Sequence, residues 1–209
     1  MRMRLLLTLA VALCGLVPAT PAQADSLLSG VLPGLVSPSD TPETCAASPS
    51  QPFSQFGDSN YYVLAPGGAF ESGDPAWKLN GGAKVVRGNE SFYVHDRADR
   101  QSLFLPEGST ATSPPMCFAL GDWHFRFFVM GSGSVRVKVV VKSLLGVVST
   151  LDGGTVRAGS TWKPSPEVEL LLSNVCGLLA TDAVSVRLTP VGDSDLRIDD
   201  VYLDPWKSG

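Results

Sequence analysis

The sequence has 209 residues, and its 20 aspartates and glutamates outnumber its 16 lysines and arginines, which gives a formal net charge of −4. This acidic balance excludes a general electrostatic attraction to nucleic acid or to anionic lipid. The length is that of a single domain able to bury a sizeable hydrophobic core.

The first 24 residues have the pattern of a secretory signal peptide. Arg2 and Arg4 precede an apolar run from Leu5 to Val17, and Ala22-Gln23-Ala24 provides the small residues of a cleavage site. The apolar run is too short to form a stable transmembrane helix. We therefore expect cleavage after Ala24 and a secreted, extracellular or envelope-associated protein. Losing Arg2 and Arg4 leaves 14 basic residues against 20 acidic ones, a net charge of −6.

Residues 25–59 are rich in serine, proline and threonine, which predicts an irregular N-terminal arm. Beyond residue 60, short β-type runs alternate with turn residues, and no stretch keeps a 3.6-residue apolar period. Many short strands about 8 to 12 residues apart are typical of a β-sandwich, so we expect one all-β domain over residues 60–206. The expected strands are 61–64, 84–87, 91–94, 102–105, 116–119, 123–130, 135–142, 146–151, 155–158, 168–172, 183–189 and 196–203.

The segment from Trp123 to Lys142 has the clearest strand pattern. Before its turn, Trp123 and alternate residues as far as Val129 share one apolar face, and four alternate valines do the same after the turn. The turn Gly131-Ser132-Gly133 suits a three-residue hairpin loop whose last glycine is left-handed. The sequence therefore predicts a β-hairpin.

The opposite face of this predicted hairpin carries His124, Arg126 and Phe128 on one strand and Arg136 and Lys138 on the other. The predicted register places Arg126 opposite Lys138, and like charges across a strand pair are destabilising by up to about 1 kcal/mol. Either carboxylates of neighbouring strands neutralise the pair, or the face binds an anionic ligand. On the second interpretation these five residues form a ligand-binding site, with Phe128 as an apolar platform.

The last predicted strand changes phase near its middle. Leu196 and Ile198 alternate with polar residues, but Val201 and Leu203 continue in the opposite phase, with Asp199 and Asp200 between them. Either a β-bulge accommodates the two aspartates, or Asp200 points inward, where a lone carboxylate needs a metal ion or an arginine.

The sequence does not predict an enzyme. Neither of its two histidines has a metal-binding spacing such as His-Glu-x-x-His, and the Gly-x-Ser-x-Gly nucleophile motif is absent. His95-Asp96 together with Asp99 could orient a catalytic base, but on a polar loop we expect the neighbours His95 and Asp96 to be solvated.

Three cysteines remain after cleavage of the signal peptide, in a compartment that permits disulfides. We expect Cys45, which lies in the arm, to pair with Cys117. Cys176 lies in an apolar run and can be buried as a free thiol. The alternative pairing is Cys117 with Cys176.

Several short motifs occur in the order found in one known family. Gly67-Gly68-Ala69-Phe70-Glu71-Ser72-Gly73 is followed by Trp77, then by Ser102-Leu103, by Trp162 and by Ile198-Asp199-Asp200-Val201. This order resembles the jelly-roll carbohydrate-binding modules of the galactose-binding-like fold. With its Pro114-Pro115-Met116-Cys117 segment, the wider chain is also similar to secreted actinobacterial proteins.

The resemblance implies a jelly-roll β-sandwich and a structural calcium ion. The calcium ligands it implies are Glu71 and Asp200, with Asp199 as a substitute. It also implies that Trp77 and Trp162 fill the core, although an indole ring can stack on a sugar. Tyr93 is a further candidate ligand-binding residue, because it lies on a polar loop with Asn89 and His95.

Together, these observations predict a monomeric, non-catalytic module that binds an extracellular or cell-envelope polysaccharide, with an anionic glycan as the preferred ligand. The alternative is a structural or adhesive envelope protein that binds protein partners, and a hydrolase is a weaker third option. We expect no nucleic-acid binding and no stable membrane insertion.

Overall fold

A computed structural model describes residues 48–74, 76–116, 123–143, 147–170 and 181–204. The described residues all belong to one compact unit, which lies within residues 41–209. The predicted signal peptide, most of the arm, and Cys45, Cys117 and Cys176 lie outside the described residues. Export and the Cys45–Cys117 disulfide therefore stay predictions.

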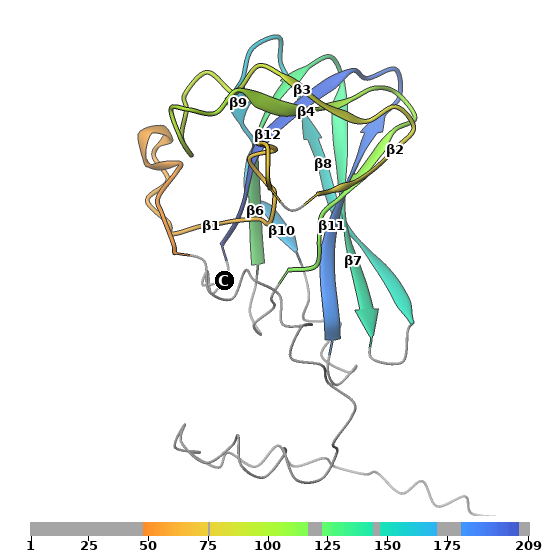
Figure 1. The fold of residues 1–209 in the computed structure, drawn as a ribbon. Coiled ribbons are helices and arrows are strands. Elements are labelled where there is room, and N and C mark those ends of the chain that lie inside the picture. The colour runs from red at the N-terminus through yellow and green to blue at the C-terminus, as the bar shows by residue number, and fades with distance from the viewer. Residues whose placement is uncertain (1–47, 75, 117–122, 144–146, 171–180, 205–209) are drawn as a thin grey trace, which may run out of the picture. The chain divides into compact units, whose positions relative to one another are not determined.

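The described residues form two antiparallel β-sheets (Figure 1), as expected for a jelly-roll β-sandwich. One sheet has seven strands, with the order β10-β6-β12-β4-β3, while β1 pairs with β12 and β9 pairs with β6. The other sheet has the order β2-β5-β11-β7-β8. The strands are β1 (Val63–Leu64), β2 (Lys78–Asn80), β3 (Lys84–Arg87), β4 (Gln101–Leu105), β5 (Thr110–Thr112), β6 (Trp123–Gly131), β7 (Ser134–Ser143), β8 (Val148–Arg157), β9 (Lys163–Pro164), β10 (Val168–Leu170), β11 (Thr181–Val191) and β12 (Leu196–Asp204).

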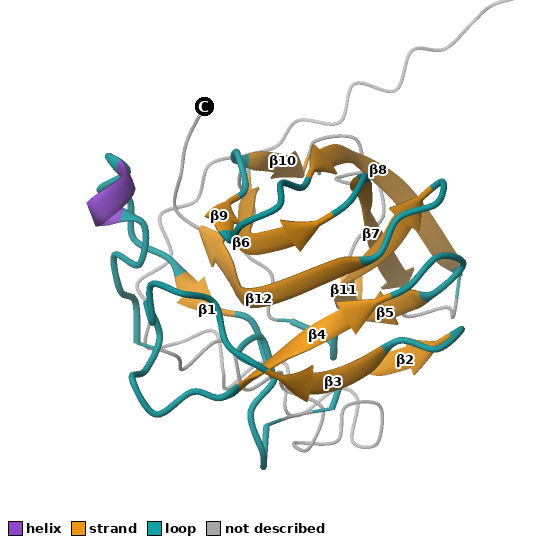
Figure 2. Cartoon of the chain, turned by 90° about the horizontal axis from the view of Figure 1, so that it is seen from above, coloured by secondary structure: helices purple, strands orange, loops and turns teal. Residues whose placement is uncertain are grey.

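The hydrophobic core lies between the two sheets, where alternate residues of the long strands meet. Phe125, Phe127 and Val129 of β6 and the alternate valines of β7 belong to this one cluster of buried residues. Figure 2 shows the two groups of strands from above. The period-two patterns that predicted strands therefore also identified the residues of the core. In the part of the chain that the structure describes, no helix is long and apolar enough to cross a membrane.

The predicted hairpin between β6 and β7 is wrong. Both strands form close to their predicted limits, but β6 pairs with β12, β10 and β9, whereas β7 pairs with β11 and β8. The short connection at Ser132-Gly133 therefore crosses from one sheet to the other. The apolar faces of the two strands still meet, because they face each other across the core rather than lying side by side.

Both faces of β6 are buried, which the alternation in its sequence does not show. Its second face carries Phe128, which joins a separate aromatic cluster with Phe53, Tyr62 and Tyr202. Phe53 lies just before the 3-10 helix η3 (Ser54–Phe56), in the segment predicted to be an irregular arm. Its side chain is fully buried, so the folded domain begins before residue 60.

Three further differences concern local structure. Residues 91–94 were expected to form a strand, but they form a turn instead. The two strands expected at 146–151 and 155–158 are one continuous strand, β8, with an irregularity near its glycine pair. Strands β2, β5 and β9 lack a predictive pattern because each has only two or three residues.

Candidate functional site

The phase change in the last strand is a β-bulge, as one of the two interpretations predicted. The pairing of β12 with β6 shifts register between Asp199 and Tyr202. Asp200 has a φ of 46°, the left-handed region that a residue with a side chain seldom adopts. The bulge turns both aspartates into the protein, where each has no exposed surface.

The two buried aspartates differ in their hydrogen bonds. Asp199 Oδ2 accepts a hydrogen bond from the Glu90 amide at 2.7 Å, and its Oδ1 accepts one from the Asp200 amide at 3.0 Å. Both carboxylate oxygens of Asp200 are buried without a hydrogen-bond partner. An unsatisfied buried carboxylate is costly, so Asp200 is the unusual group in the middle of β12.

Burial and neighbouring charges raise the pKa of both aspartates. The pKa of Asp199 rises to about 9, chiefly through burial and then through the charge of Asp200. Burial, followed by the charge of Glu90, raises the pKa of Asp200 to about 7, whereas His95 lowers it through its charge and through its nearby backbone amide, which does not reach hydrogen-bond geometry. Several acidic groups therefore share one poorly solvated region.

The loop from Gly88 to Arg100 covers this region, and Glu90 organises it. Glu90 has no exposed surface, and its carboxylate accepts hydrogen bonds from the amides of Phe92 and Val94, the latter at 2.7 Å. These bonds hold the loop in a tight turn, in which Tyr93 has a φ of 51°. This local hydrogen bonding explains why residues 91–94 do not extend as a strand.

The same loop brings His95 and Asp99 to Asp200. Asp99 Oδ2 lies 2.8 Å from His95 Nδ1 and also accepts a hydrogen bond from the Asp96 amide at 3.2 Å. One ligand atom from each of His95, Asp99 and Asp200 lies within 4.8 Å of the others. His95 and Asp96 are exposed, as expected for neighbours on a polar loop, whereas only 7% of the Asp99 side chain is exposed.

Burial lowers the pKa of His95, but the hydrogen bond and the negative charge of Asp99 outweigh it, so the net shift is upward. The spacing His95 to Asp99 was visible in the sequence. Nothing in the sequence pattern shows that a bulge more than 100 residues away places Asp200 beside them.

Next to this cluster lies a polar pocket of about 500 Å³. Its walls include Asn89, Tyr93 and Asp99, together with Arg87, Gly88, Arg100 and Gln101. Tyr93 is 45% exposed, which leaves its ring available to a ligand. The structure therefore places Tyr93 in a pocket beside Asn89, as its position on a polar loop suggested.

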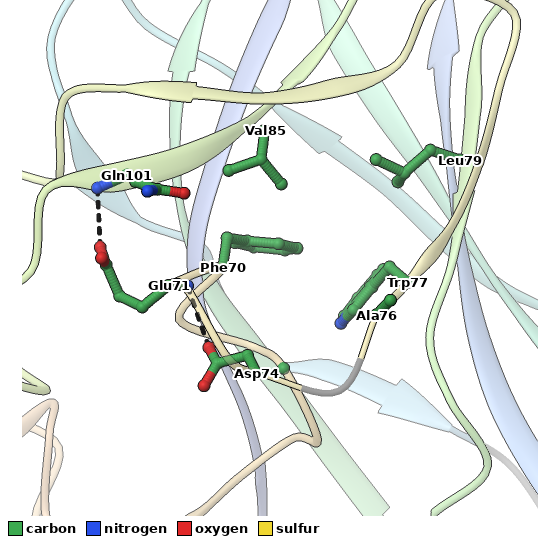
Figure 3. Close-up of a pocket in the computed structure, with 9 residues that line it drawn as sticks. Phe70, Glu71, Asp74, Ala76, Trp77, Leu79, Val85 and Gln101 are labelled. Carbon is green, nitrogen blue, oxygen red and sulfur yellow. Dashed lines mark hydrogen bonds between the residues drawn. The ribbon is translucent and has the colours of Figure 1, made fainter.

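The residues implied for calcium do not form one set of ligands. Glu71 Oε1 accepts hydrogen bonds from the amides of Arg100 and Gln101, at 2.6 and 2.7 Å, and the Gln101 contact is drawn in Figure 3. Asp199 uses both oxygens for backbone amides. Among the described residues, Glu71 is not part of the cluster around Asp200. Calcium binding by Glu71 and Asp200 therefore stays a prediction.

Glu71 also borders a smaller hollow of about 200 Å³, which Figure 3 shows with Phe70 and Trp77 on its inner side. Trp77 is buried against Phe70, with ring centres 5.2 Å apart, and its Nε1 donates a hydrogen bond to the Pro66 carbonyl. Trp162 is half-buried, with the Arg197 guanidinium 5.7 Å from its ring centre. Both tryptophans thus have packing roles.

The five residues assigned to one ligand-binding face are divided between the two sheets. Arg126 is buried, forms an ion pair with Asp58, and donates to the Ser165 carbonyl. Its guanidinium also lies 4.3 Å from the ring centre of Phe53. Phe128 is fully buried and His124 nearly so. The single polar face was therefore a wrong prediction, because residues 50–64 cover this side of β6.

Arg136 and Lys138 instead lie on the solvent face of the five-stranded sheet. Lys138 is directly across from Arg187 of β11 on one side and from Asp152 of β8 on the other. Arg136 is flanked by Thr155 and Thr189. The register places six basic residues on this face, namely Lys78, Arg136, Lys138, Lys142, Arg157 and Arg187. We call these six residues the basic face.

No family of known proteins matches the sequence, and no curated protein sequence matches it. Among solved structures, the chain is similar to the CBM22-1 and GH10 modules of a Clostridium thermocellum xylanase complexed with xylohexaose, at 13% identity and a TM-score of 0.50. This likeness covers 72% of the chain and 29% of the xylanase chain. The chain thus spans less than a third of that structure.

Two further solved structures are carbohydrate-binding modules. The CBM22-2 xylan-binding domain of Paenibacillus barcinonensis Xyn10C has 11% identity and a TM-score of 0.47, over 68% of this chain and 98% of that one. The family 11 module of a Clostridium thermocellum cellulosomal cellulase has 16% identity and a TM-score of 0.41, over 69% and 94%.

At these identities, the likeness shows the fold alone. The two sheets, their order and the similarity to the xylanase structure confirm the jelly-roll β-sandwich predicted from the sequence.

Proposed function

We propose that this chain is an exported, non-catalytic module that binds an acidic polysaccharide outside the cell or in its envelope. The binding surface is the basic face of the five-stranded sheet. Support comes from the fold, which the xylanase module complexed with xylohexaose also has, and from the charges on this face. An acidic chain of net charge −4 concentrates six cations on one side of one sheet.

The observation that carries this proposal is the position of Lys138 across from Arg187. Two cations in this relation repel each other, which costs stability unless an anion lies against them. Asp152 lies across from Lys138, but no ion pair forms between described residues at Arg136, Lys138 or Arg187. A bound carboxylate or phosphate polymer provides the missing negative charge.

The rest of the face suits a polysaccharide. Thr112, Thr150, Thr155, Ser185 and Thr189 occupy outward positions between the cations and offer hydroxyl groups. An outward aromatic residue on which a neutral sugar would stack is absent from the described part of these five strands. Affinity on this face therefore depends on charge and hydrogen bonds, which favours an acidic over a neutral polymer.

The test compares two variants that lose the same charge. The triple variant Arg136→Gln, Lys138→Gln, Arg187→Gln removes the centre of the basic face, and the control Lys84→Gln, Arg97→Gln, Lys163→Gln removes three cations elsewhere. Binding to immobilised polygalacturonate and to neutral xylan is measured by titration at low and high salt. We expect the first variant to weaken binding to polygalacturonate at least about tenfold, and the control to bind as the wild type does.

Equal binding by both triple variants would exclude the basic face. The variant Tyr93→Ala tests whether the sugar binds in the polar pocket of the loop from Gly88 to Arg100 instead. If this variant alone abolishes binding, the sugar occupies that pocket. Binding to envelope proteins but to neither polymer would support the adhesive function instead, and release of reducing sugar would show a hydrolase.

A further inference from the structure

The side chains of His95, Asp99 and Asp200 are potential metal ligands and do not belong to the basic face. We propose that these three side chains bind a first-row divalent transition-metal ion, with zinc as the representative ion. This proposal does not depend on glycan binding. It shares Asp200 with the calcium site implied by the sequence resemblance, but differs in its other ligands and in the kind of ion.

The first argument is the state of Asp200. Its carboxylate has no exposed surface and both of its oxygens lack a hydrogen-bond partner, although it sits in a left-handed residue of a β-bulge. Buried carboxylates are normally paired with a cation or coordinate a metal. No described lysine or arginine forms an ion pair with it. A bound cation would give this carboxylate the partner that it lacks.

The second argument is geometric. His95, Asp99 and Asp200 each place one ligand atom within 4.8 Å of the other two. Nitrogen and oxygen ligands bind zinc at about 2.0 to 2.2 Å, which puts neighbouring ligands of a tetrahedral site about 3.4 Å apart. His95 Nδ1 and Asp99 Oδ2 are 2.8 Å apart. Side-chain rotations that move the ligand atoms by about 1 Å would therefore bring them to the spacing of a coordination site.

The third argument concerns which ion fits. Calcium takes six to eight oxygen ligands, whereas this cluster offers an imidazole nitrogen and two carboxylates, a combination typical of zinc and its neighbours. Two carboxylates neutralise the divalent charge. The other buried acids nearby, Glu90 and Asp199, already accept hydrogen bonds from backbone amides. Glu90 and Asp199 thus hold the backbone of the loop and of the bulge that carry the three proposed ligands.

The fourth argument is access. The His95 side chain is 38% exposed, and Asp99 also lines the polar pocket that contains Tyr93. An ion can therefore enter from solvent, and water can complete its coordination. A three-residue site with an open position is a common arrangement for zinc.

The experiment uses the full chain, stripped with a chelator and alkylated under non-reducing conditions so that free thiols do not bind zinc. Zinc, manganese and calcium are titrated separately by calorimetry. We expect zinc to bind with one-to-one stoichiometry and calcium to bind at least about 100-fold more weakly. His95→Gln and Asp200→Asn should each weaken zinc binding about 100-fold, and the exposed-site control Asp152→Asn should leave it unchanged.

Imidazole NMR provides an independent reading, because the chain has only two histidines. Zinc should shift the ring resonances of His95 and leave those of His124 in place. A preference for calcium, zinc binding that survives Asp200→Asn, or a shift at His124 alone would overturn the proposal. If Asp200→Asn only raises the melting temperature of the metal-free protein and zinc does not bind the wild type, Asp200 is a buried acid without an ion.

Discussion

Arg126 of β6 forms an ion pair with Asp58, a residue 68 positions earlier in the chain that precedes the first strand. The side chains of Asp58 and Arg126 are only 12% and 10% exposed. Tyr62 donates a hydrogen bond to the same carboxylate oxygen at 2.6 Å. The segment before residue 60 is thus fastened to the seven-stranded sheet by a nearly buried charge pair.

Removing one partner of this pair should be costly. Asp58→Asn leaves the Arg126 guanidinium nearly buried without its counter-charge, and we expect the free energy of unfolding to fall by about 3 kcal/mol. Urea unfolding at pH 7 measures the change. The control Asp193→Asn, at an exposed position, should change stability by less than about 0.5 kcal/mol. A double-mutant cycle with Arg126→Met that shows no coupling would contradict the ion pair.

The same pair predicts a pH dependence. Burial raises the pKa of Asp58, but hydrogen bonds from Tyr62 and the Asn60 amide, together with Arg126, lower it below 3.8 in the folded protein. A carboxyl group with a depressed folded pKa contributes stability above its unfolded pKa, and this stability is lost as the pH falls through the folded value. We therefore expect Asp58→Asn to flatten the fall in stability as the pH drops below about 4, measured by acid titration of the unfolding midpoint.

Phe53 should behave as a core residue although it lies in the serine- and proline-rich segment. Its ring stacks on Phe128, with ring centres 5.5 Å apart, and it has no exposed surface. Phe53→Ala should therefore cost about 3 to 5 kcal/mol of unfolding free energy. The control is Tyr61→Ala, which changes an aromatic residue that is 56% exposed. It should cost less than about 1 kcal/mol. Equal effects of the two changes would mean that the segment is not docked as described.

Arg187 should destabilise the sheet in the absence of a ligand. Because it lies across from Lys138, Arg187→Gln removes a repulsion, and we expect a gain of a few tenths to about 1 kcal/mol at low salt. The gain should shrink in 1 M salt, where the charges are screened. Thermal unfolding at the two salt concentrations provides the measurement, and Lys163→Gln is the charge-matched control. A loss of stability at low salt would show that the hydrogen bond from Arg187 Nε to the Thr112 hydroxyl outweighs the repulsion.

Gly68 should be intolerant of a side chain because the backbone at the bulge approaches it closely. A Cβ atom at this position would lie 2.6 Å from the Val201 carbonyl oxygen, next to Asp200. Gly68→Ala should therefore cost about 1 to 3 kcal/mol. Gly159→Ala meets its nearest atom at an ordinary 3.6 Å and should be nearly neutral. Denaturant unfolding of the two variants distinguishes steric strain from a general loss of glycine flexibility.

The all-β class could be predicted because side-chain alternation is a local property. Val135, Val137, Val139 and Val141 have to face one way on any strand, and all four are in the core. The phase change at Asp199 and Asp200 predicted either a bulge or an inward-pointing Asp200, and the structure combines the two, with a bulge that buries Asp200. In both strands, the order of a few consecutive residues is enough to predict the local structure.

The pairing of strands and the composition of the cluster at Asp200 were decided only by the tertiary structure. Strands β6 and β7 belong to different sheets. Their alternating patterns fit this arrangement, with the buried faces meeting across the core, as well as they fit a hairpin, so the patterns could not distinguish the two. His95, Asp99 and Asp200 lie together because the loop that Glu90 holds in a turn is adjacent to the bulge in β12. Contacts between residues more than 100 positions apart depend on how the whole sandwich packs, and no local pattern of side chains specifies them.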